Sequence, residues 1–506
     1  MHDTASNNKR IVKNTAMLYA RMFLVLGISL YTSRVILDAL GVIDFGIYNV
    51  VAGVTGMLLF FTSSLSNASQ RFISFEIGRK DYDSANKVFN LSFELYGIIS
   101  VFLFIALESV GLWLVNDKLV IPAERMIAAN YIFQFTVVSA ILTVLQVPYQ
   151  SVIIAEERMG IYAYMGIYNA IMKLIIVYLI TITQDRLIAY GAMFMLVELS
   201  CSLFYVFYCK KNFAICKLKF YWNKLKAREL FSFISCTAYG CVSWSLAYQG
   251  TSILLNLFFG PAINAARGIA MQINGSLTNF SSAIVTAIKP QIIKSYAAND
   301  LEQMHKLIIF SSKYTLLLFV FLSFLLFVNI DFILSIWLKD VPDYTNSFAC
   351  LIIIDSIIAS LLNPIGIAIN ATGKLRNMQV YGRTITLMAL PISYFLYKFN
   401  LILSPNGVFW ILIFAEICYW LYCFHDMHRQ IKLSYFDYFS KVVFPIGKVI
   451  ILSLFAVYGM SYFPFEGWQR FFIVTVLLFI IISASSVILV LTKNEKRFIV
   501  NYIKSR

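Results

Sequence analysis

Long apolar runs recur along the whole chain, separated by short polar segments. A helix needs roughly 20 mostly apolar residues to cross the hydrocarbon core of a bilayer. Fourteen runs meet this length, at about 12–37, 45–65, 88–115, 126–150, 160–182, 187–209, 230–259, 263–288, 307–338, 347–370, 379–398, 407–424, 442–463 and 470–491. They are continuous rather than short alternations, which favours helices over a β-barrel. The sequence predicts an all-α polytopic membrane protein with about 14 transmembrane helices.

The composition excludes several other classes of protein. Apolar residues make up 60% of the 506-residue chain and charged residues 13%, against roughly 45–50% and 25% in soluble domains. A soluble enzyme, a disordered chain and a secreted disulfide scaffold are therefore excluded. No phosphate-binding GxxxxGK[ST] loop is present, and no loop is long enough for a catalytic domain. We therefore expect neither an enzyme nor a bound cofactor, and the eight cysteines form no CxxC pair that would suggest a metal site.

The net charge of +15 is explained by topology rather than by nucleic-acid binding. With a cytoplasmic N-terminus, the inner segments carry 29 lysines and arginines and the outer segments carry 7. This bias is typical of the positive-inside rule. It predicts that both termini are cytoplasmic.

An internal repeat appears when the chain is compared with itself at an offset of 219 residues. Ten positions between 32 and 81 are identical without a gap, among them Gly41 with Gly260 and Asp81 with Asp300. The offset covers six helices, so the two halves run in the same direction and are related by a pseudo-two-fold axis along the membrane normal. The predicted organisation is a six-helix lobe at 1–209, a basic cytoplasmic linker at 210–229, a second six-helix lobe at 230–424, and helices 13 and 14 with a tail at 425–506. Two such lobes suit alternating access.

The runs at 12–37, 45–65, 230–259 and 263–288 are unusually polar for helices exposed to lipid. In the last of these, the polar residues recur close to one helical face: they are Asn264, Arg267, Asn274, Thr278 and Ser281. Small polar residues also join transmembrane helices together, so packing is one interpretation. A shared water-filled cavity is the other, because these runs are repeat equivalents.

Charged residues inside the spans carry the stronger indication. Each costs roughly 2.5–3.5 kcal/mol at a helix centre, so such residues usually face a cavity or a partner. One interpretation is that the cations pair with span acids such as Glu198, Asp355 and Glu416. Glu94 and Lys313 occupy equivalent repeat positions, and a gate formed by their ion pair is a further hypothesis. The cations within the spans are Arg21, Arg34, Lys173 and Lys313.

Several segments resemble one transporter family. They are NTAMLYARM at 14–22, LYTSRV at 30–35, GIYNVV at 46–51, QRF at 70–72, IAEERM at 154–159, INAARG at 263–268, PQIIKSY at 290–296 and ATGK at 371–374. In order and spacing, the chain resembles the bacterial polysaccharide-biosynthesis flippase family of the multidrug/oligosaccharidyl-lipid/polysaccharide transporter superfamily.

The resemblance implies a two-lobed fold of the drug-extrusion type in the bacterial inner membrane. It implies that undecaprenyl-pyrophosphate-linked oligosaccharides are flipped to the outer leaflet for lipopolysaccharide O-antigen or capsule assembly. The expected partners are that lipid-linked substrate, membrane lipid and other polysaccharide-assembly membrane proteins, with no nucleic acid. The family's cavities are cationic, so the candidate substrate-binding residues here are Arg21, Arg34, Lys173 and Arg267, together with Tyr31, Asn274 and Thr278.

Three alternatives stay open at this stage. A multidrug or cation antiporter of the same fold is expected to carry an unpaired acid in its cavity, typically on the first helix, where this chain has arginines and only Asp38 at the outer end. A glycan polymerase or ligase needs a sizeable external loop, and none is present. A peptidoglycan-precursor flippase shares the pyrophosphate headgroup chemistry and is the hardest to separate.

Overall fold

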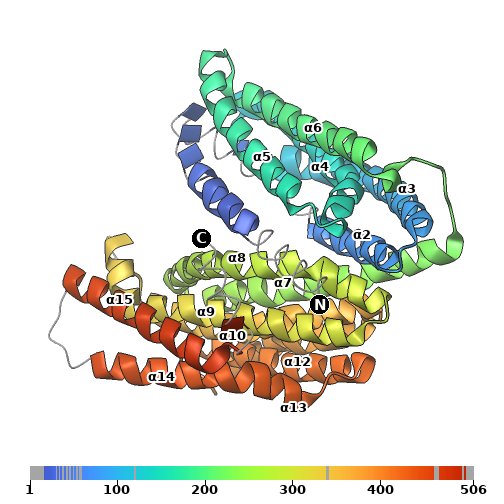
Figure 1. Cartoon of the computed structure of the whole chain (residues 1–506). Coiled ribbons are helices and arrows are strands. Elements are labelled where there is room, and N and C mark those ends of the chain that lie inside the picture. The colour runs from blue at the N-terminus through green and yellow to red at the C-terminus, as the bar shows by residue number, and fades with distance from the viewer. Residues whose placement is uncertain are drawn as a thin grey trace. The chain divides into compact units, whose positions relative to one another are not determined.

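The computed structural model describes residues 16–29, short pieces between 31 and 55, and then 60–118, 121–337, 341–460, 467–492 and 495–496. Most of these residues are helical, and no β-strand occurs among them, which confirms the predicted all-α class. The helices are Ala16–Ser29, α2 (Phe60–Gly78), α3 (Tyr82–Ala106), α4 (Met126–Ala155), α5 (Met159–Leu179), α6 (Arg186–Asn212), α7 (Lys224–Phe259), α8 (Pro261–Ala297), α9 (Leu301–Trp337), α10 (Thr345–Thr372), α11 (Arg383–Lys398), α12 (Gly407–Ile431), α13 (Tyr435–Tyr438), α14 (Phe444–Met460) and α15 (Gly467–Ser485) (Figure 1).

Ten of the described helical segments are long and apolar enough to cross a membrane. Each of the fourteen predicted runs overlaps a described helix, but four do not meet both criteria. Ala16–Ser29 and α11 are short, and α2 and α8 are absent from the ten. The polar stripe of α8 lowers its hydropathy although the helix has 37 residues.

Several helices extend beyond the predicted runs. The helix α2 continues to Gly78, α7 already begins at Lys224, and α12 continues to Ile431. Apolar run length detects the part of a helix that crosses hydrocarbon. The polar turns at the helix ends carry no such signature, so the predicted linker at 210–229 shrinks to the segment between α6 and α7.

The chain divides into two compact units, and the division lies inside helices. Unit 1 comprises Met1–Cys241 and Ile293–Asn299, and unit 2 comprises Val242–Ile292 and Asp300–Arg506. The end of α8 is tied into unit 1 because Lys294 Nζ lies 2.9 Å from the carboxylate of Glu157, whose side chain is almost fully buried. The sequence predicted a boundary in the linker instead, where apolar character is lost.

Within unit 1, α4 packs against α6, α2 and α3 (Figure 1). The aromatic side chains Phe89 and Tyr149 meet edge to face in its core, with ring centroids 5.1 Å apart. Within unit 2, α10 packs against α12 and α9, and α15 packs against both α14 and α9.

The 219-residue repeat reappears as a repeated turn. Lys80 and Asn299 both adopt left-handed backbone conformations, with φ of 61° and 59°. The next residue in each case is an aspartate that caps a helix: Asp81 accepts a 2.9 Å hydrogen bond from the amide of Ser84, and Asp300 accepts one of 2.9 Å from the amide of Gln303. Aspartate is among the preferred N-cap residues because it satisfies free backbone donors. The equivalence of α3 and α9 thus holds at the level of single hydrogen bonds.

Candidate functional site

A cavity of about 340 Å³ lies inside unit 1. Four helices contribute to its wall: Ala16–Ser29, α4, α5 and α6. The residues that line it are Arg21, Val25, Ser29, Gln146, Gln150, Tyr162, Met165, Gly166, Asn169, Ala170, Lys173, Glu198, Cys201 and Tyr205. The structure therefore brings together two of the predicted site residues, Arg21 and Lys173.

The helix α5 presents one polar stripe to this cavity. Tyr162, Gly166, Asn169 and Lys173 follow one another at steps of four, three and four residues. Residues at this spacing share one face of an α-helix. The stripe was visible in the sequence, and it would have identified Tyr162, Gly166 and Asn169 as lining residues.

Arg21 is held by an aromatic ring and by the space beside a glycine. Its guanidinium carbon lies 4.5 Å from the centre of the Tyr162 ring, within the range of a cation–π interaction. Gly166 allows this approach, because a Cβ there would lie 2.8 Å from the guanidinium carbon. Among the residues that the structure describes, no carboxylate pairs with Arg21. Its charge is therefore available to a ligand.

Lys173 differs from Arg21 because it has an acid partner. Its Nζ lies 3.2 Å from Oε1 of Glu198 and 4.4 Å from the centre of the Phe194 ring. The Asn169 amide donates a 3.1 Å hydrogen bond to the same carboxylate oxygen. The cavity lining thus contains two cations and one carboxylate, and it carries a net positive charge.

The cavity also offers uncharged hydrogen-bonding groups. Gln146 is buried, and its Oε1 has no hydrogen-bond partner among the described residues. A buried polar atom without a partner is unfavourable unless water or a ligand satisfies it. Gln146 and Gln150 are one turn apart on α4, so both amides reach the same wall.

The other predicted residues of the N-terminal lobe lie elsewhere. The Tyr31 hydroxyl lies 2.9 Å from the Tyr178 hydroxyl, and Tyr31 is not part of the cavity lining. Arg34 lies outside the described residues, and its predicted contribution stays a prediction.

The predicted residues of α8 belong to unit 2. Arg267 is buried and donates hydrogen bonds to the Ser252 hydroxyl, at 3.2 Å, and to the backbone carbonyl of Tyr248. Asn274 is buried with its Oδ1 unpartnered among the described residues, whereas Thr278 is exposed and donates to the carbonyl of Gly275 at 3.0 Å. Arg267 is thus anchored to the backbone of its own unit.

A second polar cluster in unit 2 was not predicted as a site. The Tyr248 hydroxyl donates to the buried carboxylate of Asp355, whose other oxygen has no partner in the described part of the chain. Glu416 is also buried; it accepts a 3.2 Å hydrogen bond from Thr386 and lies 3.7 Å from Nη1 of Arg383. The sequence analysis singled out both acids, but it counted Arg383, near the start of the run at 379–398, among the inner cations rather than as a site residue.

The two residues of the predicted gate each have a partner inside their own unit. Glu94 accepts a 2.8 Å hydrogen bond from the backbone amide of Tyr221, in the segment that joins α6 to α7. Lys313 is buried and lies 2.7 Å from a carboxylate oxygen of Glu495. The ion pair between the lobes stays a prediction.

No protein-family model matches the sequence, and a search of curated proteins finds no match. Solved structures match clearly. An outward-facing multidrug resistance MATE family transporter of the MOP superfamily superposes with a TM-score of 0.70 at 14% identity, covering 84% of this chain and 96% of that one. The chain has the MATE transporter fold.

Two further structures with this fold have named sources. A MATE transporter of Vibrio cholerae gives a TM-score of 0.66 at 15% identity, over 86% of this chain and 99% of that one. A MOP superfamily transporter from Pyrococcus furiosus gives 0.65 at 12% identity, over 83% and 96%. That protein is described as having a binding pocket of reverse polarity that suggests a different function.

Proposed function

We propose that this protein is a flippase that moves undecaprenyl-pyrophosphate-linked oligosaccharide across the bacterial inner membrane by alternating access. It would serve the assembly of lipopolysaccharide O-antigen or capsule. The observation that carries the proposal is Arg21, a guanidinium that lines a cavity within the helical bundle of unit 1 and has no carboxylate partner among the described residues.

The charge of the cavity fits the headgroup of such a lipid. A pyrophosphate carries at least two negative charges, and moving charge into hydrocarbon is costly. Arginine offers a planar fork of donors that binds phosphate oxygens in pairs, and lysine adds a compact charge. Arg21 and Lys173 would replace part of the water that the pyrophosphate loses, while the prenyl chain stays in lipid. Tyr162 and the two glutamines would face the first sugar.

The charge of the cavity also helps to distinguish between the possible substrates of a protein with this fold. The description of the Pyrococcus furiosus transporter indicates that pocket polarity varies within the superfamily. A net positive cavity favours an anionic substrate over a cationic drug. A peptidoglycan-precursor flippase shares the headgroup and differs only in the sugar.

The proposal is tested with purified protein in proteoliposomes. A fluorescent, dithionite-sensitive undecaprenyl-pyrophosphate oligosaccharide is incorporated, and the fraction that becomes accessible to external dithionite measures flipping. Arg21→Ala should lose most of the activity, Arg21→Lys should retain part of it, and Arg79→Ala, at an exposed arginine, should match the wild type. Flipping by Arg21→Ala at the wild-type rate would overturn the proposal.

One observation favours a second candidate, an ion-coupled cation antiporter. Asp355 and Glu416 are two buried acids of unit 2, and among the described residues Arg383 is the one cation given near them. Such a pair could take up a proton or a metal cation. If Asp355→Asn abolishes export of a cationic dye in whole cells while Arg21→Ala leaves it unchanged, the antiporter is favoured over the flippase.

A further inference from the structure

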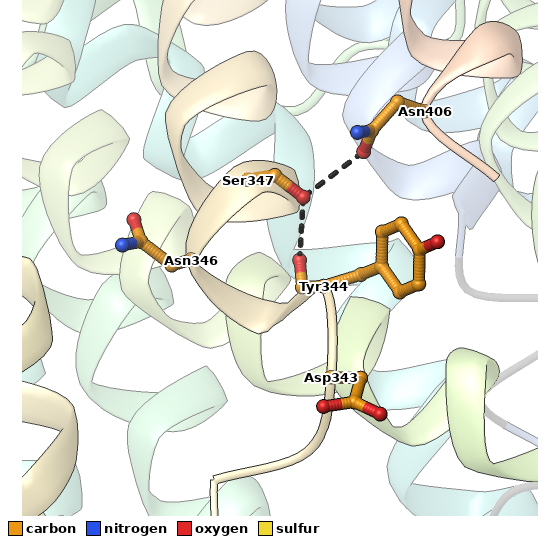
Figure 2. Close-up of a pocket in the computed structure, with 5 residues that line it drawn as sticks. All are labelled: Asp343, Tyr344, Asn346, Ser347 and Asn406. Atoms are coloured by element: carbon orange, nitrogen blue, oxygen red, sulfur yellow. Dashed lines mark hydrogen bonds between the residues drawn. The ribbon is translucent and has the colours of Figure 1, made fainter. Parts of the chain in front are cut away.

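A pocket of about 720 Å³ lies in unit 2, away from the polar cluster of Asp355 and Glu416. It lies where α10 begins and where the turn before α12 ends. Figure 2 shows the side chains that line it: Asp343, Tyr344, Asn346, Ser347 and Asn406. The pocket is an open, shallow depression at the surface rather than an enclosed cavity.

Tyr344 forms an aromatic platform in this pocket. Its ring is 43% exposed and stacks on the buried ring of Phe348, with centroids 5.9 Å apart and an angle of 28° between planes. Phe348 is backed in turn by Phe409, at 4.7 Å. The platform is therefore held from below by the core of unit 2. Tyr344 as a whole remains partly exposed.

The backbone at Tyr344 is unusual. Its φ of 67° lies in the left-handed region, which a bulky side chain rarely adopts. The other non-glycine residues with positive φ in the described chain are Lys80, Glu157, Asn299, Asn400 and Lys432, and none of them is aromatic. A glycine would be less strained at Tyr344. Strained residues of this kind cluster at ligand sites, which indicates that the tyrosine ring has a use at this position.

The polar groups of the pocket are oriented by one another. The Ser347 hydroxyl has one proton and lies 3.0 Å from two acceptors, the backbone carbonyl of Tyr344 and Oδ1 of Asn406 (Figure 2). When this proton is donated to Asn406, the amide nitrogen of Asn406, which has no acceptor among the described residues, is left to donate to a ligand. Asn346 is occupied, because it donates to Asp331 at 2.5 Å. The carboxylate of Asp343 has no partner in the part of the chain that the structure describes.

An aromatic face, one free carboxylate and one free amide donor together suit a neutral saccharide. A carboxylate can accept hydrogen bonds from two neighbouring hydroxyl groups, an amide NH₂ can donate to a ring or hydroxyl oxygen, and the C–H face of a sugar can lie on a tyrosine ring. An anionic ligand would meet the negative charge of Asp343. A metal ion would find no group of three histidine, cysteine, aspartate or glutamate ligands among the described residues.

We infer that this pocket binds a neutral sugar unit of the transported glycan. The inference rests on the proposed function and on the loop-charge topology, which places the connection between α9 and α10 on the outer side of the membrane. The pocket would receive the oligosaccharide after translocation, separately from the cationic cavity that holds the pyrophosphate. A shallow site with few polar groups binds weakly, which permits release to the next step of assembly.

The test is saturation-transfer NMR on the full-length protein in detergent, with glucose, galactose, rhamnose and N-acetylglucosamine as separate probes. At least one sugar should receive saturation from the wild type. Asp343→Asn should weaken its binding about tenfold, because a hydrogen bond to a charged group is lost. Tyr344→Gly should abolish binding while the protein remains folded, because glycine suits the left-handed backbone.

A matched control is Phe399→Ala, which removes an aromatic ring that is 65% exposed at the end of α11 and does not line the pocket. This variant should bind as the wild type does. Saturation that persists in Tyr344→Gly, or that disappears equally in Phe399→Ala, would overturn the inference, as would the absence of saturation for every sugar. If Arg21-dependent flipping holds while no sugar binds, only this inference fails; if a sugar binds but no lipid is flipped, the proposed function fails.

Discussion

Replacing Gly166 with alanine tests whether the position of the Arg21 guanidinium matters, independently of its charge. The substitution adds one methyl group and changes no charge. A Cβ at this position would lie 2.8 Å from both the guanidinium carbon and Nη2 of Arg21, and closer still to Nε. Ordinary contact begins at 3.4 Å. Because Nε is closer than these two atoms, the guanidinium has to move by well over ~0.6 Å, and the flexible arginine side chain can do so by leaving the Tyr162 ring.

The expected magnitudes follow from this displacement. Helix stability should not suffer, since alanine is favoured over glycine inside a helix by about 0.5–1 kcal/mol. Binding should suffer, because one charge-assisted hydrogen bond contributes about 1.5–3 kcal/mol. This corresponds to a loss of about 10- to 100-fold in affinity for the lipid headgroup. Loss of function at unchanged or higher melting temperature is the expected combination.

The assay combines the dithionite flipping measurement with thermal unfolding of the same preparations. The matched control is Gly160→Ala, on the same helix, where the added methyl group would meet the end of the Met17 side chain at 2.8 Å instead of a charged group. Met17 is flexible at its end, so this variant should flip lipid normally. If Gly166→Ala flips lipid as fast as Gly160→Ala, the guanidinium of Arg21 does not hold the headgroup.

Three further predictions concern stability. Burial alone raises the pKa of Glu495, but hydrogen bonds from Lys313 hold this pKa below its ordinary value. Glu495→Gln should therefore lower the unfolding free energy by about 2 kcal/mol, which is less than the ~3–5 kcal/mol expected when a fully buried pair is broken. An unchanged unfolding midpoint would contradict this prediction. The side-chain amide of Asn90 donates a hydrogen bond to the carbonyl of Lys217 in the linker and accepts one from the amide of Lys219. Loss of both hydrogen bonds in Asn90→Ala should make tryptic cleavage of the linker about 30-fold faster. A hydrogen bond from the amide of Ser84 lowers the pKa of Asp81 from 3.8. The stability advantage of wild type over Asp81→Ala should therefore be constant above pH 5 and disappear as the pH falls below that lowered pKa, and thermal unfolding across pH would reveal any other pattern.

The sequence predicted the helical class and both cations of the cavity because these depend on local signals. Arg21 and Lys173 could be recognised because charge inside an apolar run is costly wherever it occurs. The partner of Lys173 could not, because Glu198 is on another helix and only packing decides which acid it meets. The same reason explains Lys313, which binds Glu495, 182 positions away. Helix ends were misjudged where polar turns continue a helix beyond the apolar run, as at Lys224.

No pattern in the sequence indicated the pocket around Tyr344. Tyr344 and Ser347 lie within one helical turn of the sequence, whereas Asn406 is 59 residues away from Ser347, in the connection that precedes α12. A left-handed tyrosine has no local signature either, since Asn and Gly are the residues that normally indicate this conformation. Only the folded chain shows that the ring, the amide and the carboxylate of Asp343 share one space.

The placement of the unit boundary inside α7 and α8 has a mechanical consequence. The chain passes from one unit to the other at Cys241–Val242, at Ile292–Ile293 and at Asn299–Asp300. The first junction lies inside α7 and the second inside α8, rather than in loops. A rocking motion of the two units, which the proposed function requires, would therefore bend α7 and α8. The backbone of α8 is weakest near its junction, because Pro290 lacks the amide that would close a helical turn. The bending stiffness of these two helices, which Pro290 lowers in α8, would then set how quickly the proposed flippase turns over.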